Sequence, residues 1–365
     1  MKSPLLLEDH SRIATQEAIK LLSGDGGGFF NANSAHPFEN PTPRTNLAEM
    51  VLIFALGAAL TNCFGRMVGS ERQGWVLLCV MAILFGLGAG GLYAMEASGN
   101  PAIAALEVDQ TAGPQQSGGN MEGKEARFGV AGSALFADVS TASSDGAVNS
   151  MHDSFMPLAG GILLANMMVD EVIVGAPGSG LYGMLLFGIV AVFLAGLMIG
   201  RTPEYVGKKI AAAEVKMTVL ALICIPAATL GLTAIACVVK AGLVGLGNVG
   251  PHGYSEILYA YASAAATNGS AFAGLSTNSW FYNLSLALAM FVGRFAVMVP
   301  VLAVAGSLAR QRIVPRSAGG LPTDGILFVS FLLGVIVIVG GLTYLPALAL
   351  GPIVEHLQML GGANF

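Results

Sequence analysis

Charged residues are scarce in this chain: only 11% of its 365 residues are Asp, Glu, Lys or Arg, whereas 54% are hydrophobic. Average soluble domains carry about 25% charged residues, because a surface that faces water has to be polar. A surface that faces lipid does not need those charges. The composition therefore excludes an ordinary soluble domain and predicts a membrane protein.

The sequence also lacks the marks of nucleic-acid binding and of redox chemistry. Its net charge is -5, and no basic patch is interleaved with aromatic residues. The apolar stretch Pro4–Leu7 is too short for the hydrophobic region of a signal peptide. The few cysteines form no CxxC pair and lie in apolar runs, so we interpret them as buried small side chains. These cysteines are Cys63, Cys79, Cys224 and Cys237.

Motifs for phosphate binding and catalysis are missing as well. There is no GxxxxGK[ST] loop and no Asp-Lys-Thr-Gly motif, so the chain cannot hydrolyse ATP by either familiar route. His152-Asp153-Ser154 has the residue types of a serine hydrolase, but triad groups converge from separate elements. We interpret this triplet as a polar cap of a helix that starts near Met156.

No catalytic residue and no organic cofactor are therefore predicted, and a membrane enzyme is a remote alternative. Three of the five histidines have no partner at metal-ligand spacing, and we interpret these three as loop or cap residues. They are His36, His252 and His356.

Long apolar runs are what the chain has in abundance. About 20 consecutive apolar residues cross the bilayer core as a helix. One run carries Asp170 and Glu171 and then breaks at Gly175–Gly180. The predicted spanning helices are Leu47–Phe64, Trp75–Met95, Met156–Val174, Leu181–Ile199, Val215–Val239, Phe281–Leu308 and Ile326–Leu350.

The connecting segments predict the orientation and a repeat. Basic segments favour the cytoplasm, and these are Arg66–Arg72, Arg201–Lys216 and Arg310–Arg316. The glycine-rich segments then face outside, and an outgoing helix, an outer segment and a returning helix recur, as in many transporters. We expect residues 1–70 to be the second half of repeat 2, 71–205 repeat 3 with a broken returning helix, 206–312 repeat 4, and 313–365 a C-terminal transmembrane helix and tail.

A short pattern recurs between the two helices of each repeat: a helix-compatible stretch, a small residue, Asp or Asn, and Gly. Backbone carbonyls replace the water around a cation where the chain takes the unusual φ/ψ values that glycine permits. A helix C-terminus adds negative partial charge. One copy would be an ordinary turn, since Asp-Gly and Asn-Gly are turn signals, but three copies favour a cation filter. The copies are Thr15–Leu22 with Gly24-Asp25-Gly26, Ala131–Ala142 with Ser144-Asp145-Gly146, and Tyr259–Ala266 with Thr267-Asn268-Gly269.

Several longer motifs closely resemble the potassium-transporting ATPase A chain (KdpA) family, the ion-translocating subunit of the bacterial Kdp system. The resemblance runs from about Gln16 to Val354. The motifs that carry it occur in the family's order. They are Gly26-Gly27-Gly28-Phe29-Phe30-Asn31 and its continuation to Pro41, Asn120-Met121-Glu122-Gly123-Lys124-Glu125, Gly146-Ala147-Val148-Asn149-Ser150-Met151-His152-Asp153-Ser154, Gly200-Arg201-Thr202-Pro203-Glu204-Tyr205 and Asn268-Gly269-Ser270-Ala271-Phe272-Ala273-Gly274-Leu275.

The resemblance implies an all-α polytopic membrane protein in which helix–re-entrant loop–helix units surround a pseudo-fourfold pore. It implies the potassium-binding and translocating subunit of a P-type ATP-driven import complex in the bacterial inner membrane, with its filter loops outside. K⁺ is then the only metal, as the transported ion. ATP is bound by a partner, the P-type ATPase catalytic subunit, and small accessory subunits and membrane lipid are the other partners.

The resemblance also assigns roles to particular residues. The filter positions are the three triplets that begin at Gly24, Ser144 and Thr267. The last residue of each triplet, Gly26, Gly146 or Gly269, matches a filter glycine of the family. The break that includes Gly178, Ser179 and Gly180 resembles an intramembrane loop that obstructs the inward path. Glu171 matches a family acid, and we expect it to lie on the cation pathway or to anchor that loop. For Arg294, alone in an apolar run, we expect a carboxylate, carbonyl or lipid-phosphate partner, or snorkelling to an interface.

Two departures from the family are visible. The first repeat and the first helix of the second repeat are absent, so one of four filter strands is expected to be missing. Gly24-Asp25 stands where the family has Thr-Asn, and Asp145 is a second added carboxylate. If ionised, these acids strengthen the cation field and weaken potassium-over-sodium discrimination. A free-standing cation channel or secondary transporter, a transport-dead truncated product and one half of a split subunit remain alternatives.

Overall fold

The computed structural model describes residues 4–176, 178–200, 203–313 and 322–362, with the side chains of residues 4–11 left out. Within these ranges the regular structure is helical except for β1 (Glu204–Tyr205) and β2 (Lys208–Lys209), which pair antiparallel. Six helical stretches are long and apolar enough to cross a membrane, which confirms the all-α, multi-pass class. They are Pro43–Met67, Glu71–Ala104, Ser179–Ile199, Ala212–Val238, Trp280–Arg310 and Ile326–Leu360.

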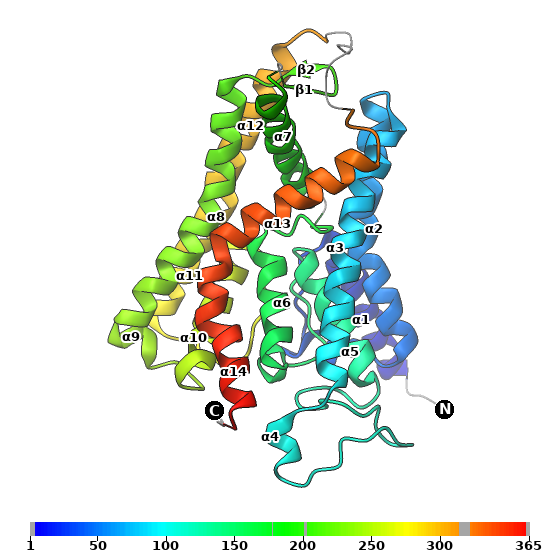
Figure 1. Ribbon diagram of the computed structural model, residues 1–365. Coiled ribbons are helices and arrows are strands. Elements are labelled where there is room, and N and C mark those ends of the chain that lie inside the picture. Colours follow the sequence, from blue (N-terminus) through cyan, green and yellow to red (C-terminus); the bar gives the residue numbers. More distant parts are fainter. Residues whose placement is uncertain (1–3, 177, 201–202, 314–321, 363–365) are drawn as a thin grey trace.

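The spanning stretches alternate with shorter helices. In Figure 1, α1, α5, α6 and α10 lie in the half of the molecule that carries α4, and the β1–β2 hairpin lies at the opposite end. The helices are α1 (Pro4–Ser23), α2 (Pro43–Met67), α3 (Glu71–Ala97), α4 (Pro101–Ala104), α5 (Gly129–Ala142), α6 (Pro157–Met168), α7 (Ser179–Ile199), α8 (Ala212–Val238), α9 (Lys240–Leu243), α10 (Gly250–Ala266), α11 (Trp280–Phe291), α12 (Val297–Arg310), α13 (Ile326–Leu348) and α14 (Val354–Leu360). The 3₁₀ turns are η1 (Asn33–Ala35) and η2 (His152–Ser154), and the π turns are η3 (Val292–Ala296) and η4 (Ala349–Ile353).

The predicted span Met156–Val174 is wrong in its extent. The helix there, α6, has 12 residues, which cover about 18 Å, whereas the hydrocarbon core is about 30 Å thick. Asp170 and Glu171 adopt left-handed backbone conformations with φ of 64° and 50° and so prevent the helix from continuing. The chain resumes as α7 at Ser179. The broken returning helix is therefore α6, a break and α7.

The break itself differs in position from the expected Gly175–Gly180. It begins after Met168, where α6 ends, and closes at Gly178, the N-cap of α7. Ser179 and Gly180 consequently belong to the helix. Three residues of the sequence motifs, Pro177, Arg201 and Thr202, lie outside the described part of the chain.

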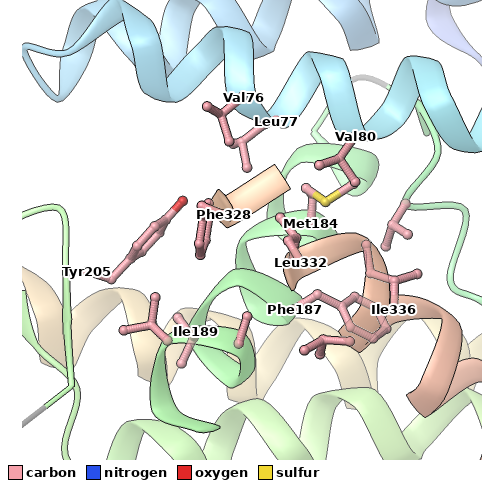
Figure 2. Close-up of a cluster of buried hydrophobic side chains, with 14 of the residues drawn as sticks. Val76, Leu77, Val80, Met184, Phe187, Ile189, Tyr205, Phe328, Leu332 and Ile336 are labelled. Atoms are coloured by element: carbon pink, nitrogen blue, oxygen red, sulfur yellow. The ribbon is translucent and has the colours of Figure 1, made fainter. Parts of the chain in front are cut away.

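A buried apolar cluster joins α3, α7 and α13 near the hairpin (Figure 2). Lipid is as apolar as these side chains, so close packing holds the helices together more than removal from water does. The labelled members come from α3, α7, β1 and α13 in turn. They are Val76, Leu77 and Val80, then Met184, Phe187 and Ile189, then Tyr205, and last Phe328, Leu332 and Ile336.

A second cluster holds the short helices. Leu92 of α3, Ala134 of α5, Leu163 of α6 and Tyr259 of α10 are buried together at 0–1% exposure. These contacts enclose α5 and α10 among longer helices, and the loop that follows α5 is buried inside the protein. Irregular backbone at membrane depth is tolerated in such surroundings.

Candidate ion-binding site

Three glycine-containing loops meet at one cavity. They follow the ends of α1, α5 and α10 and comprise Gly24–Gly28, Ser144–Ala147 and Thr267–Ser270. Asp25, Gly146 and Gly269 line the same cavity of about 500 Å³, one from each loop. The three triplets singled out in the sequence are therefore brought together, although more than 100 residues separate one from the next.

The loops pack on one another in a fixed order. Gly26 has φ of +59°, and a Cβ atom there would lie 1.9 Å from the Asp145 carbonyl oxygen. Gly146 has φ of +76°, and its Cβ would lie 2.3 Å from the Asn268 carbonyl oxygen. Only glycine fits such backbone-to-backbone contacts. Gly269 has nothing within 4 Å on the corresponding side, so the first loop packs on the second, the second on the third, and the third has an open side.

The loops begin in two ways. Gly24 and Thr267 both have left-handed backbone conformations, with φ of +70° and +60°, directly after the last residues of their helices. Ser144 follows α5 without a positive φ, after an extended Ser143. A left-handed conformation is costly for threonine, and such residues are concentrated at functional sites.

The side chain before each filter glycine differs in its contacts and its burial among the three loops. The Asn268 side chain accepts from Ser270 N–H at 3.0 Å and donates to the carbonyls of Ser140 and Ser143 at 2.9 and 2.7 Å. Asp145 is fully buried, and its carboxylate accepts from Ala147 N–H at 3.0 Å. Both side chains thus turn into the protein and hold their own loops.

Asp25 is exposed instead. It lines both the cavity between the loops and a second hollow of about 590 Å³ beside α1. The two added acids are therefore not equivalent. Of Asp25 and Asp145, only Asp25 lines the cavity.

The break between α6 and α7 is attached to the second loop. The Ser144 hydroxyl donates to the Glu171 carboxylate and lies 3.3 Å from the Ser179 hydroxyl. The N–H groups of Val174 and Gly175 both donate to the carbonyl of Ala142, the last residue of α5, at 3.1 Å. Glu171 and Ser179 thus lie next to Ser144, a predicted filter residue.

The two glycines of this segment have different surroundings. Gly178 has φ of +103° and open space around the position of a Cβ, whereas a Cβ on Gly180 would lie 2.0 Å from the Val174 carbonyl oxygen. Gly180 therefore lets α7 begin directly against the break.

Arg294 lies on the π turn η3 and is exposed. The preceding Gly293 packs against α10, where its Cβ would lie 1.8 Å from the Ala265 carbonyl oxygen. Within the described residues, Arg294 makes no ion pair and no hydrogen bond through its side chain. No carboxylate or carbonyl lies within bonding distance of its guanidinium there, although the charge of Arg294 acts on the Glu171 carboxyl at longer range. The partner of Arg294 stays a prediction.

The histidines and the 152–154 triplet require corrections. His252 is buried in α10, and its ring nitrogens bond to Glu355 at 2.7 Å and Asp153 at 3.0 Å, so it is not an unpartnered loop residue. Burial disfavours its charge, but these two carboxylates raise the pKa of His252 to about 10. His356 lies within α14, and only His36, stacked on Phe30, is a loop residue as predicted.

The triplet does not cap α6 by a side chain. His152 is buried and bonds to the Tyr259 hydroxyl at 2.7 Å. The free N–H of Met156 donates to the Glu96 carboxylate at 2.7 Å instead. Glu96 also pairs with Lys124 at 2.7 Å, and both side chains are fully buried. A distant carboxylate therefore supplies the acceptor that the sequence suggested was local.

One group of side chains has the composition of a metal site. Asp153, His252 and Glu256 offer ligand atoms within 4.8 Å of one another. Both nitrogens of His252 are already bonded to carboxylates, and Glu256 accepts from the N–H groups of Gly247 and Asn248 at 3.0 Å. We interpret the group as a satisfied hydrogen-bond network that ties α10, η2 and α14 together.

Two residues at the loops were missed by sequence reasoning. The Lys20 ammonium donates to the Gly27 carbonyl, and the Ser263 hydroxyl donates to the Ser270 carbonyl at 2.7 Å. Each stands six residues before the filter glycine of its own copy. That common spacing was visible in the sequence.

Comparison with known proteins agrees with the sequence motifs. The family described as potassium-transporting ATPase A subunit matches residues 9–357. Proteins named potassium-transporting ATPase potassium-binding subunit are similar to this chain: those of Granulibacter bethesdensis and Mesorhizobium japonicum are each 61% identical over 97% of the chain and 61% of their own length. That of Rhodopseudomonas palustris is 60% identical over 95% of the chain and 60% of its length. The chain thus spans about 60% of the length of these relatives, and it belongs to the potassium-transporting ATPase A subunit family.

Proposed function

We propose that this chain binds K⁺ between its three loops and passes it inward as part of a P-type ATP-driven import complex. The observation that carries the proposal is the convergence of the three loops on one cavity. The relatives' name, potassium-binding subunit, supports the choice of ion. The chain then has no catalytic site of its own, and a partner ATPase subunit binds ATP.

The chemistry of the loops suits a weakly hydrated monovalent cation. Backbone carbonyls carry partial charges, so they replace hydration water without the strong binding that a cage of carboxylates gives. The ends of α1, α5 and α10 add the negative ends of three helix dipoles. Gly24 to Gly26, Ser144 to Gly146 and Thr267 to Gly269 are the proposed filter positions.

We further propose that a fourth strand closes the ring. The second loop leaves parts of the other two loops uncovered. In the third loop, Gly269 has an open side. In the first loop, Asp25 is exposed and lines the hollow beside α1. The longer relatives have additional sequence that can supply such a strand. The repeat boundaries near residues 70, 205 and 312 follow from the same proposal.

The break between α6 and α7 has the proposed role of a gate. It is bonded through Glu171 to Ser144 and through Gly175 to Ala142, and so lies against the second loop. With the loops on the extracytoplasmic side of the inner membrane, as the basic connecting segments predict, an ion that leaves the second loop meets this segment next.

Growth of a transporter-deficient bacterial strain in limiting K⁺ tests the function. The strain expresses the ATPase and accessory subunits with this chain, either alone or together with the N-terminal part of a relative. We expect growth when that part is present. Growth with the chain and partners alone would show that three strands suffice, and no growth in either case, with the protein present in the membrane, would refute the proposal.

A further inference from the structure

The first loop is attached to α1 by the Lys20 ammonium, which the proposed function does not use. Lys20 is 5% exposed, and its ammonium donates to the Gly27 carbonyl. The same nitrogen lies 2.8 Å from Glu17 and 3.2 Å from Glu39. Glu39 also accepts from Phe30 N–H at 3.2 Å. One ammonium thus joins α1, the carbonyl that follows Gly26 and the segment beyond the loop.

In the third loop, the side chain at the same position, six residues before the filter glycine, makes the corresponding contact. Ser263 donates to the Ser270 carbonyl, seven residues on, as Lys20 does to Gly27. The backbone agrees, because Asp25 N–H donates to the Lys20 carbonyl at 3.2 Å and Asn268 N–H donates to the Ser263 carbonyl at 2.9 Å. The two side chains are therefore structural equivalents, and in the first and third loops a donor at this position fixes the carbonyl after the filter glycine. Ser140 stands at the same position of the second loop, but its hydroxyl has no hydrogen-bond partner among the described residues.

Packing does not fix Gly27 in the way that it fixes Gly26. Gly27 has φ of +88°, and the position of a Cβ there has no atom within 4 Å, whereas Gly26 lies directly against Asp145. The hydrogen bond from Lys20 is consequently the contact that sets the direction of the Gly27 carbonyl. The number and field of the carbonyls that face an ion govern selectivity between cations.

We propose that Lys20, together with Glu39, is a positioning residue for the first strand of the potassium filter. Lys20 holds the Gly27 carbonyl against α1, and Glu39 holds both the ammonium and the N–H of Phe30. The inference rests on the proposed function for its effect on transport, but the positioning of the loop is measurable without transport. Lys20 does not itself touch the ion.

Hydrogen exchange of the purified chain in lipid nanodiscs tests the positioning. Lys20→Met removes the donor at similar length, Lys20→Arg keeps a cationic donor, and Ser263→Ala is the matched change in the third loop. We expect Lys20→Met to speed exchange of the amides in residues 24–30 about tenfold or more, about 1.4 kcal/mol of local stability. Residues 267–272 should keep the wild-type rate, Ser263→Ala should give the reverse pattern, and Lys20→Arg should stay close to wild type.

Lys20→Met leaves two buried carboxylates without their cation, which endangers folding. The double variant Lys20→Met with Glu39→Gln removes one of those charges and repeats the test in a less strained protein. Faster exchange confined to residues 24–30 in either variant supports the proposal. Wild-type exchange there in a folded variant, or an equal increase in both loops, overturns it.

Potassium uptake by the assembly that supports growth gives the second readout. We expect Lys20→Met to raise the half-saturating K⁺ concentration about tenfold and to narrow the K⁺/Na⁺ ratio, with a smaller effect on the maximal rate. A fall in the maximal rate alone would mean a general structural role and would refute the filter role. Absence of uptake by the wild-type assembly would refute the proposed function instead, and the loop positioning would then be decided by the exchange pattern.

Discussion

Replacing Gly146 by alanine tests how tightly the second and third loops are joined. The added Cβ would lie 2.3 Å from the Asn268 carbonyl oxygen, at a backbone φ of +76°. The left-handed conformation costs an alanine about 1–2 kcal/mol, and relief of the overlap by backbone movement costs about 1–3 kcal/mol more. We therefore expect Gly146→Ala to lower the stability of the chain by about 2–5 kcal/mol.

Gly269→Ala is the matched control, because it has the same kind of strain without the overlap. Its φ is +95°, and no atom lies within 4 Å of the added Cβ. We expect only the conformational cost of about 1–2 kcal/mol. Thermal unfolding of both variants in the same detergent should therefore give a clearly lower midpoint for Gly146→Ala.

Gly269→Ala also tests the proposed fourth strand when the N-terminal part of a relative is added. If a fourth strand packs on Gly269, then Gly269→Ala should become about as destabilising as Gly146→Ala. Equal midpoints of the two variants in the isolated chain would refute the one-directional packing of the loops. A Gly269→Ala cost that does not change on addition of the N-terminal part would refute the fourth strand at this side.

Three further predictions concern selectivity, the gate and pH. Asp25→Asn should raise the K⁺/Na⁺ uptake ratio a few-fold, because Asp25 lines the cavity. Asp145→Asn changes a buried side chain and should change the ratio less. An equal K⁺/Na⁺ ratio before and after Asp25→Asn would disprove the added field. Glu171→Ala should raise passive Rb⁺ leak several-fold, because a hydrogen bond contributes about 0.5–1.5 kcal/mol and here ties the break to Ser144; an unchanged leak in proteoliposomes would argue against the gate. The two carboxylates beside His252 raise its pKa from 6.5 to about 10. The contacts of the protonated ring therefore contribute to the free energy of unfolding in full below pH 6.5, and this contribution is lost as the pH rises through 10. The unfolding temperature of wild type should fall more steeply across that window than that of His252→Gln, and parallel curves would contradict this.

Much of the fold was predictable because apolar length and glycine-rich breaks are local signals. Six of the expected spans coincide with spanning helices of the structure, and the three triplets follow helices as predicted. The extent of Met156–Val174 was not predictable from hydropathy, since Asp170 and Glu171 end α6 through their backbone conformation.

The partners of polar side chains were less predictable, because they come from distant parts of the chain. His252 meets Asp153 and Glu355, which lie 99 and 103 residues away. Likewise, Asp25 and Asp145 have equivalent places in the sequence pattern, but one is exposed and the other buried. Their difference depends on which loop lies next to each, and a repeat pattern alone does not supply that information.

The most direct measurement of the central claim is the position of the bound ion. Thallium(I) substitutes for K⁺ and scatters anomalously, so crystals of the chain with its closing N-terminal part, grown with Tl⁺, locate the site. We expect an anomalous peak among the carbonyls around Gly26, Gly146 and Gly269, lost on competition with K⁺ and retained in excess Na⁺. A peak elsewhere, for example at Asp153 and His252, with none between the loops would contradict it.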